Sequence, residues 1–326
     1  MRITALAGGV GGARFLRGLC HHLEGSGGLA SSTVTVIGNT GDDITLFGLR
    51  VCPDLDTILY TLGGGVHEEQ GWGRDGDAHL AQAELTALGV PPQWFGLGDK
   101  DFGTHLARSL WLGQGFTLSE VTARLAARWG LPQLGVTLLP MTDTPVETHV
   151  VVADENGEQA IHFQEWWVRM RAAVPARRFL VAGMDQATAA PGVLEAITQA
   201  DVVLLPPSNP VVSVGIILGV PGVRDALRDT AAPVIGVSPL VSGRPVRGYA
   251  DACLSAIGVQ ATAAAVAELY ADFLDGWLVD PSDAGMPYPP GLVVRPRPLL
   301  MSDVEAAGDI AGEALQLAEA LLARSR

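Results

Sequence analysis

The sequence predicts an α/β fold: a Rossmann-like, doubly wound and mainly parallel sheet with a helical insert. The first indication is that apolar runs of strand length alternate with helical patterns, at 3–7 and 13–23 and again at 200–205 and 234–237. The second is that glycine-rich or polar stretches begin where predicted strands end, for example after 33–37. Open parallel sheets place their ligands at this edge, so both observations predict the same architecture.

The bulk composition indicates one well-packed domain spanning residues 1–326. Hydrophobic residues make up 48% of the chain and charged residues 17%, which is typical of a globular protein. The net charge of −14 argues against nucleic-acid binding, because that function needs a positive surface. Three scattered cysteines without CxxC spacing favour reduced thiols in a cytoplasmic protein. With neither a signal peptide nor a membrane-length apolar stretch visible, we expect no membrane partner.

A glycine run, Gly8–Gly12, lies between the first predicted strand and the first predicted helix. Glycines let a backbone approach a phosphate closely, and a helix N-terminus offers free N–H groups to it. The run is not a Walker A loop, and Arg14 stands where a dinucleotide fingerprint has its third glycine. A tight structural turn is the alternative. The phosphate-binding hypothesis assigns four residues here: Gly9, Gly11, Gly12 and Arg14.

An acidic stretch follows the strand at 33–37. It places four carboxylates between Gly38 and Thr57, namely Asp42, Asp43, Asp54 and Asp56. Carboxylate oxygens suit Mg²⁺, which takes one or two of them and leaves its other positions to water and phosphate. The alternative is that Asp, Asn and Gly only form turns. The neighbouring glycine run favours the metal hypothesis.

The remaining elements complete the α/β pattern. The helical insert is expected at about 57–130, with helices at 56–62, 78–88, 103–112 and 118–129. Later strands are expected at 136–140, 149–153, 159–163, 200–205, 234–237, 278–279 and 299–301, and later helices near Val214, at 261–274 and at 303–324. The Asp154–Gly157 segment contains Asn-Gly, a strong hairpin signal. Pro206–Pro210 is a second polar loop at the end of a strand.

Several motifs carry a family resemblance. They are Gly8-Gly9-Val10-Gly11-Gly12-Ala13-Arg14, Asn39-Thr40-Gly41-Asp42-Asp43, Pro53-Asp54-Leu55-Asp56-Thr57, Gly98-Asp99-Lys100-Asp101, Thr104-His105, Met141-Thr142-Asp143-Thr144-Pro145-Val146, His162-Phe163-Gln164-Glu165 and Pro207-Ser208-Asn209-Pro210. In this order they resemble the 2-phospho-L-lactate transferase family over nearly the whole chain. Two positions depart from the usual pattern: Lys100 stands where arginine is common, and Thr142-Asp143-Thr144 where Ser-Asp-Asp is common.

The resemblance implies a reaction of coenzyme F420 biosynthesis. The family joins a guanylylated three-carbon phosphoacid to the hydroxyl of the deazaflavin Fo and releases GMP, with Mg²⁺. It implies Asp43 and Asp56 as metal-binding and catalytic residues, with base and ligand not distinguished, and Lys100 near Fo. The other substrate-binding residues are then the glycine-run residues with Asn39, Thr40, Asp54, Pro207, Ser208 and Asn209. Actinobacterial members use the phosphoenolpyruvate-derived donor, but no motif here separates a lactyl from an enolpyruvyl group.

Two other classes remain as alternatives. Gluconeogenesis-factor-like regulators bind nucleotide sugars and share the glycine run and the Asp-Asp pair, but they usually continue Gly-Gly-Ser-Ser-Gly. Here Asp42-Asp43 continues Ile44–Gly48, which favours the transferase. An NAD-dependent oxidoreductase is disfavoured by Arg14 and by the lack of an acidic residue closing the second strand.

Three further expectations concern assembly and substitutions. An apolar-rich chain with a helical insert favours a homodimer. We expect Asp43→Asn and Asp56→Asn to keep near-normal melting temperatures and lose most activity. We also expect Gly11→Val to stay folded and bind GDP more weakly.

Overall fold

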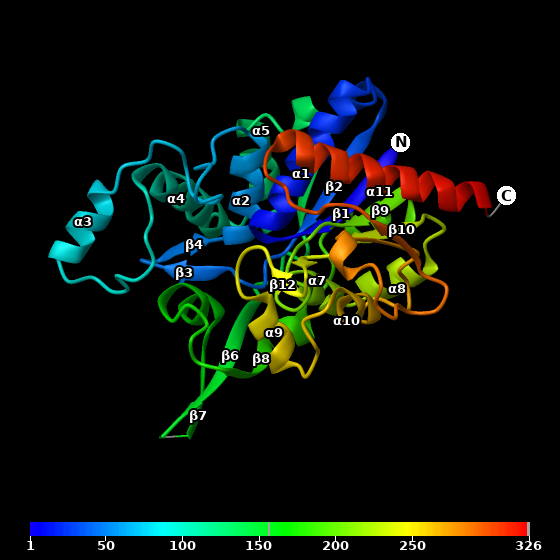
Figure 1. The fold of residues 1–326 in the computed structure, drawn as a ribbon. Helices are drawn as coiled ribbons and strands as arrows, with labels where there is room; N and C mark the ends of the chain where they lie inside the picture. Colours follow the sequence, from blue (N-terminus) through cyan, green and yellow to red (C-terminus); the bar gives the residue numbers. More distant parts are fainter. Residues whose placement is uncertain (156, 325–326) are drawn as a thin grey trace.

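The computed structural model describes residues 1–155 and 157–324. Its centre is a seven-stranded parallel sheet with strand order β14-β13-β10-β9-β1-β2-β5 (Figure 1). The strands are β1 (Arg2–Ala7), β2 (Thr33–Gly38), β5 (Val136–Pro140), β9 (Val202–Leu205), β10 (Val234–Val237), β13 (Gly276–Val279) and β14 (Val293–Pro296). The sheet grows in both directions from β1, so the predicted doubly wound α/β fold is confirmed.

Helices cover both faces of the sheet. One face packs against α1 (Gly9–Gly25), α2 (Pro53–Leu62), α5 (Leu118–Arg128) and α11 (Val304–Arg324); the other packs against α6 (Val193–Thr198), α7 (Val214–Gly219), α8 (Val223–Asp229) and α10 (Ala263–Glu268). Figure 1 shows α11 running beside α1 along one side of the molecule. Alternate residues of β1 serve the two faces: Ile3 and Ala5 join the first core and Leu6 the second. Burial on both faces explains why the central strands are continuous apolar runs.

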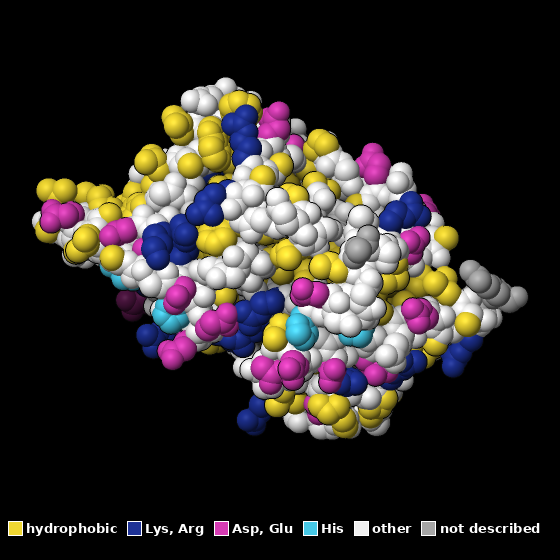
Figure 2. Space-filling model, turned by 90° about the horizontal axis from the view of Figure 1, so that it is seen from above, with side chains coloured by type: hydrophobic (Ala, Val, Ile, Leu, Met, Phe, Trp, Pro, Cys, Tyr) yellow, Lys and Arg dark blue, Asp and Glu magenta, His cyan; other side chains and the backbone are white. Residues whose placement is uncertain are grey.

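The region of the predicted insert contains α2, α3 (Leu80–Ala87), α4 (Asp99–Gly113) and α5. Helix α3 projects from the body of the molecule and buries none of its residues (Figure 1). Hydrophobic side chains are visible at this projecting end in Figure 2, and Leu80 and Leu88 are 73% and 75% exposed. Helix α5 begins with a capping box between Thr117 and Glu120.

Helix α4 begins four residues before the predicted start at 103. The Asp77 carboxylate accepts hydrogen bonds from the backbone N–H groups of Lys100 (2.8 Å) and Asp101 (3.2 Å). This cap satisfies donors that the first turn of a helix leaves free. Because the capping residue lies more than twenty positions upstream, the local pattern around Gly98 gave no sign of it.

An antiparallel three-stranded sheet with order β7-β6-β8 lies beside the main sheet. It contains β6 (Glu147–Asp154), β7 (Gly157–His162) and β8 (Ala176–Ala182). The predicted pairing of the first two strands is confirmed, while Asn156 of the predicted Asn-Gly signal lies outside the described residues. Strand β8 is an addition that the sequence analysis missed, because exposed and half-buried residues alternate in it without a strong apolar signal.

Other elements differ from the predictions or were missed. The last strand is β14 in the Pro-rich segment and not 299–301, and as an edge strand it tolerates Pro296. The helix predicted at 261–274 is the shorter α10. The acidic stretch contains an unpredicted hairpin of β3 (Ile44–Leu46) and β4 (Leu49–Val51), and α1 begins at Gly9 inside the glycine run. Further short elements are α9 (Ala250–Ala256), β11 (Leu240–Val241), β12 (Arg244–Pro245), the 3-10 turns Leu29–Ser31, Pro132–Leu134, Met184–Gln186 and Pro281–Asp283, and a π-helical turn, Glu165–Arg169.

Candidate functional site

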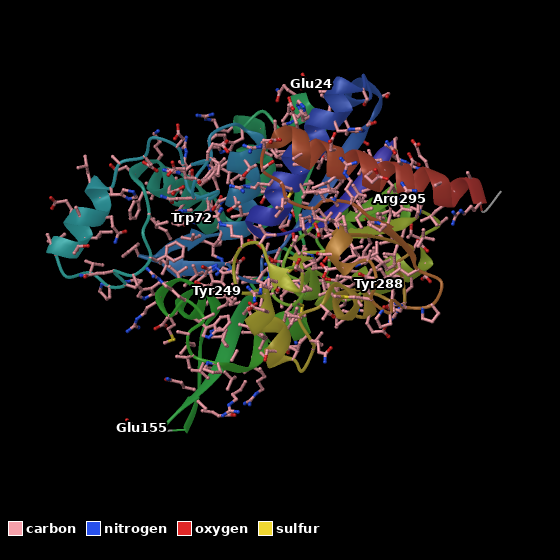
Figure 3. The ribbon with its side chains drawn as sticks, viewed as in Figure 1. Glu24, Trp72, Glu155, Tyr249, Tyr288 and Arg295 are labelled. Carbon is pink, nitrogen blue, oxygen red and sulfur yellow. The ribbon has the colours of Figure 1, made fainter. Side chains whose placement is uncertain are left out.

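A cavity of about 660 Å³ opens at the carboxyl edge of the parallel sheet. Its walls include residues that follow β1, β9 and β10, the first turn of α2, and parts of the insert. Figure 3 labels two lining residues: Trp72 comes from the insert region and Tyr249 from the segment before α9. The cavity therefore lies where ligands bind in open α/β sheets.

The glycine run and the Pro-Ser-Asn loop clamp each other at one end of the cavity. The Ser208 hydroxyl donates to the carbonyl of Gly8 (2.8 Å) and accepts from its N–H (3.1 Å). A Cβ on Gly11 would lie 2.4 Å from the Pro207 carbonyl oxygen, and one on Gly12 would lie 2.5 Å from Ser208 Oγ. Side chains are therefore excluded here, since real Cβ atoms do not approach so closely.

Asp54 and Asp56 both lie in the first turn of α2 and both line the cavity. Residues two apart on a helix point in directions about 200° apart. Asp54 lies against Gly8, whose added Cβ would meet its carboxylate oxygen at 2.2 Å. Asp56 points to α4. We call these two surroundings the sheet side and the helix side.

On the sheet side, Asp54 and Asp42 are held by neutral groups. Asn39 donates to Asp54 Oδ2 (2.9 Å) and, more weakly, to Asp42 Oδ1 (3.4 Å), while Gln164 donates to Asp42 Oδ2 (2.8 Å). Burial raises the pKa of Asp54 to about 6, although hydrogen bonds from Asn39 and the Gly9 N–H lower it in part. Burial and the nearby Asp54 raise the pKa of Asp42 well above its usual range. Because no cation among the described residues lies between the buried carboxylates of Asp42 and Asp54, this arrangement favours protonation of one of them or the binding of a positively charged group.

On the helix side, Asp56 forms a buried ion pair with Arg108 of α4. The guanidinium donates from Nη1 to Asp56 Oδ2 (3.1 Å) and from Nη2 to Oδ1. Arg108 Nη1 also lies 3.1 Å from His105 Nδ1, which makes that ring nitrogen an acceptor. Burial lowers the pKa of His105 to about 4, so the ring is neutral near pH 7. The charge of Asp56 is thus balanced within the protein.

Asp43 occupies a separate buried position and does not line the cavity. Its carboxylate lies 3.6 Å from Arg50, and neither of its oxygens has a hydrogen-bond partner. Burial raises its pKa to about 7 despite the opposing effect of Arg50. His162 holds the backbone of this residue, because Nδ1 accepts from the Gln164 N–H (3.0 Å) and Nε2 donates to the Asp43 carbonyl (3.1 Å).

The sites expected from sequence divide into two groups. Eight of the expected residues line the cavity: Gly9, Gly11, Arg14, Asp54, Asp56, Pro207, Ser208 and Asn209. Five lie outside its lining: Gly12, Asn39, Thr40, Asp43 and Lys100. Gly12 and Asn39 lie directly behind lining residues, whereas Lys100 donates to the carbonyls of Asp75 (2.8 Å) and Gly76 (3.0 Å) on the exposed side of the insert.

Sequence reasoning missed several residues that build the site. Arg108, Asp101, His105, Gln164 and Arg50 were not assigned roles. Motif membership was a signal for Asp101, His105 and Gln164, which all lie in stretches that carry the family resemblance. For Arg50 and Arg108 no local signal exists, since their charge partners are brought to them only by the fold.

The described residues do not contain a complete metal-binding cluster. Within 1–155 and 157–324, no group of three or more His, Cys, Asp or Glu is arranged to hold a metal ion. Mg²⁺ nevertheless needs only one or two carboxylates when substrate phosphates supply other ligands. The unpartnered oxygens of Asp43, with Asp56 close enough to influence its pKa, fit such a partial site.

Fold and cavity together define a Rossmann-like α/β protein with a small-molecule site at the carboxyl edge of its sheet. Within that class, the chain belongs to the family 2-phospho-L-lactate transferase CofD, whose family model matches residues 3–288. The resemblance seen in the sequence is thereby confirmed. The chain is a transferase of coenzyme F420 biosynthesis that moves a phosphoenolpyruvyl or phospholactyl group.

Similar proteins cover the whole chain. A phosphoenolpyruvate transferase of Thermobifida fusca is 61% identical over 100% of both chains. Phosphoenolpyruvate transferases of Kitasatospora aureofaciens and Mycolicibacterium smegmatis are 58% and 52% identical, covering 98% of this chain and 98% and 99% of theirs.

The fold also has a counterpart among solved structures. Protein BH3568 from Bacillus halodurans, a member of the upf0052 family, has a TM-score of 0.61 at 16% identity, covering 96% of this chain and 99% of that one. At this identity the likeness concerns the fold alone. Among the described residues, every helix is too short or too polar to cross a lipid bilayer.

Proposed function

We propose that the chain transfers the phosphoenolpyruvyl group from a guanylylated donor to the hydroxyl of Fo and releases GMP. The hydroxyl oxygen attacks the phosphorus that carries the three-carbon acid. The bond from that phosphorus to the bridging oxygen breaks, and GMP leaves with the electron pair. The observation that carries this proposal is the clamped pair of loops at the carboxyl edge of the sheet, together with relatives named phosphoenolpyruvate transferase.

The sheet side suits the nucleotide part of the donor. The close contacts at Gly11 and Gly12 exclude side chains at these two positions, and the first turn of α1 has N–H groups that no helix carbonyl accepts. An anion is stabilised at such a helix start. Arg14 adds a cation one turn further along the same helix and lines the same cavity. We assign the donor phosphates to this end.

A Mg²⁺ ion would be held by Asp43, whose oxygens have no hydrogen-bond partner, and by Asp56, whose oxygens also accept from Arg108. When bound, the ion would neutralise the negative charge that develops on the phosphates during transfer. The protein's own contribution is positioning: Arg108 fixes the orientation of Asp56, and His162 with Arg50 fixes Asp43. Phosphoryl transfer depends chiefly on such positioning and charge balance.

Two finer assignments belong to the same proposal. Fo would bind toward the insert. Lys100 donates to backbone carbonyls outside the cavity, so it would have to change its conformation to contact Fo. We also propose a homodimer. The exposed leucines of α3 are a candidate contact surface on each copy.

The proposed function is tested by product analysis. Purified protein is incubated with Fo, Mg²⁺ and either the enolpyruvyl or the lactyl donor, and products are identified by mass spectrometry. We expect GMP and the enolpyruvyl product to form faster than the lactyl product. Absence of product with both donors would overturn the assignment, and full turnover in EDTA would remove the metal from it.

A further inference from the structure

Asp101 differs from the other carboxylates of the site. It lies in the first turn of α4, lines the cavity, and is only 7% exposed. Its Oδ1 atom is enclosed and has no hydrogen-bond partner. The backbone N–H of the same residue is already bound by Asp77, so the side chain does not cap the helix. A buried carboxylate oxygen without a partner costs free energy, so its retention beside a cavity needs a reason.

The neighbouring carboxylates are occupied or displaced. Asp56 has both oxygens bound by the guanidinium of Arg108. Asp42 and Asp54 accept hydrogen bonds from amide groups on the sheet side. Asp43 has free oxygens but does not line the cavity. Among the aspartates lining the described cavity, Asp101 is the one on the helix side that has a carboxylate oxygen without a hydrogen-bond partner.

We propose that Asp101 is the general base that takes the proton of the acceptor hydroxyl. This inference rests on the proposed function and assigns the base to a residue other than Asp43 and Asp56. As the hydroxyl oxygen forms its bond to phosphorus, its proton moves to the Asp101 carboxylate. The leaving GMP carries the electron pair of the broken phosphorus–oxygen bond, so charge and atoms balance. Asp101 and Asp56 line the same cavity.

The surroundings of Asp101 suit this role. Burial raises its pKa to about 6, with smaller contributions from the negative charges of Asp56 and Asp77. Tyr60 on α2 and Arg74 on the insert loop lower it in part. His105, one turn later on α4, is neutral and adds no charge near pH 7. A base works best when its pKa lies near the working pH, because it is then both deprotonated and able to accept a proton.

The test compares Asp101→Asn with Asp99→Asn. Asp99 lies in the same first turn of α4, does not line the cavity, and accepts from the Ala81 N–H (2.9 Å), a bond that asparagine can keep. Both variants lose one charge at the same helix end, so the helix dipole affects both alike. Turnover is measured with saturating donor and Fo from pH 5 to 9, alongside melting temperature and GDP affinity.

We expect Asp101→Asn to lower kcat by about 10²-fold or more, while GDP affinity stays at the level of the control and the melting temperature is equal to or above that of the control. The acid limb of the wild-type pH profile should be lost in this variant and kept in Asp99→Asn. Asp101→Asn with kcat within about threefold of wild type, or with an unchanged acid limb, would overturn the base assignment and leave the transferase proposal standing. A wild-type protein that makes no product would overturn both.

Discussion

Asp54 and Asp56 are two residues apart on α2, yet Asp54 has neutral partners and Asp56 has a cationic one. Asp54 faces the sheet side, where Asn39 and the Gly9 N–H are neutral partners, and its pKa rises to about 6. Asp56 faces the helix side, where Arg108 compensates its charge. The comparison shows that one half of the cavity surrounds its carboxylates with neutral groups, which favours their protonated forms, whereas the other half balances a carboxylate with a cation of the fold.

The two sides also differ in how they are built. Strand ends and their loops supply much of the sheet side, and its contacts include backbone groups, as in the clamp between the Gly8 backbone and the Ser208 hydroxyl. Helix α4 supplies the helix side, and its contacts are between side chains, with Arg108 and His105 one turn apart. A change on the helix side should therefore act through charge, and a change on the sheet side through backbone fit.

The largest expected effect is on stability, from Arg108→Met. The variant leaves Asp56 buried without its countercharge, and removing one partner of a buried ion pair costs about 3–5 kcal/mol. Urea denaturation measures the loss. The control is Arg169→Met, which breaks an exposed pair with Glu165 and should change the free energy of unfolding by less than about 1 kcal/mol. Equal losses in both variants would show that the helix side is not charge-balanced as described.

The same pair corrects an expectation from the sequence. Asp56→Asn was expected to keep a near-normal melting temperature, but it would leave Arg108 buried without a carboxylate. We now expect this variant to lose both stability and activity. Only Asp43→Asn retains the original expectation.

The second effect is on turnover, from Asp43→Asn. Loss of a charge that serves the reacting centre should lower kcat by about 10²-fold. Stability near pH 8 should be equal or higher, because burial has raised the pKa of Asp43 to about 7 and its charged form is disfavoured by folding. Kinetics at several Mg²⁺ concentrations and thermal melting provide the measurement. Glu147→Gln is the control, since Glu147 also pairs with Arg50 (2.5 Å) but is partly exposed; a loss as large as that of Asp43→Asn would shift the role from Asp43 to Arg50.

The sheet side was largely predictable from the sequence. Apolar runs marked the central strands, and the polar residues that follow them had to meet at one sheet edge, because parallel strands end there together. The glycines mattered for a local reason that sequence conveys well: Gly11 and Gly12 have no space for a Cβ. The loop of Ser208 was predictable for the same reason, because it follows β9, the strand next to β1.

The helix side was not predictable in this way. Arg108 lies 52 positions from Asp56, and the Asp77 cap that starts α4 lies 23 positions from Lys100. Neither distance corresponds to a helical or strand period, so no local pattern joins these residues. The partner of a buried charge is chosen by tertiary packing, and a single sequence shows only that both charges exist.

The third prediction concerns backbone fit on the sheet side. Gly11→Ala places a Cβ 2.4 Å from the Pro207 carbonyl oxygen, which is closer than real Cβ atoms approach, so the loops must separate. We expect about tenfold weaker GDP binding by calorimetry and a lower melting temperature. Gly11→Val should have a larger effect, and the clash with the Pro207 backbone argues against the sequence-based expectation that this variant stays folded. Gly25→Ala at the far end of the same helix meets open space and should be neutral or slightly stabilising. Unchanged GDP affinity in Gly11→Ala would remove this loop from the nucleotide site.

The smallest expected effect is a pH dependence of stability that one carboxylate contributes. The pKa of Asp101 is about 6 in the folded protein, whereas the ordinary value of an aspartate is 3.8, so between about pH 4 and 6 the native state binds more protons than the unfolded state. The free energy of unfolding must then fall as pH rises through this window, by at most about 1.4 kcal/mol per pH unit for one group, and level off above it. Asp101→Asn removes this contribution, whereas Asp99→Asn keeps it. Urea denaturation at pH 4.5, 6.0 and 7.5 should therefore give a shallower decline for Asp101→Asn than for the control. Parallel declines in the two variants would mean that Asp101 titrates normally, and the helix side would then contain no carboxylate suited to take a proton near neutral pH.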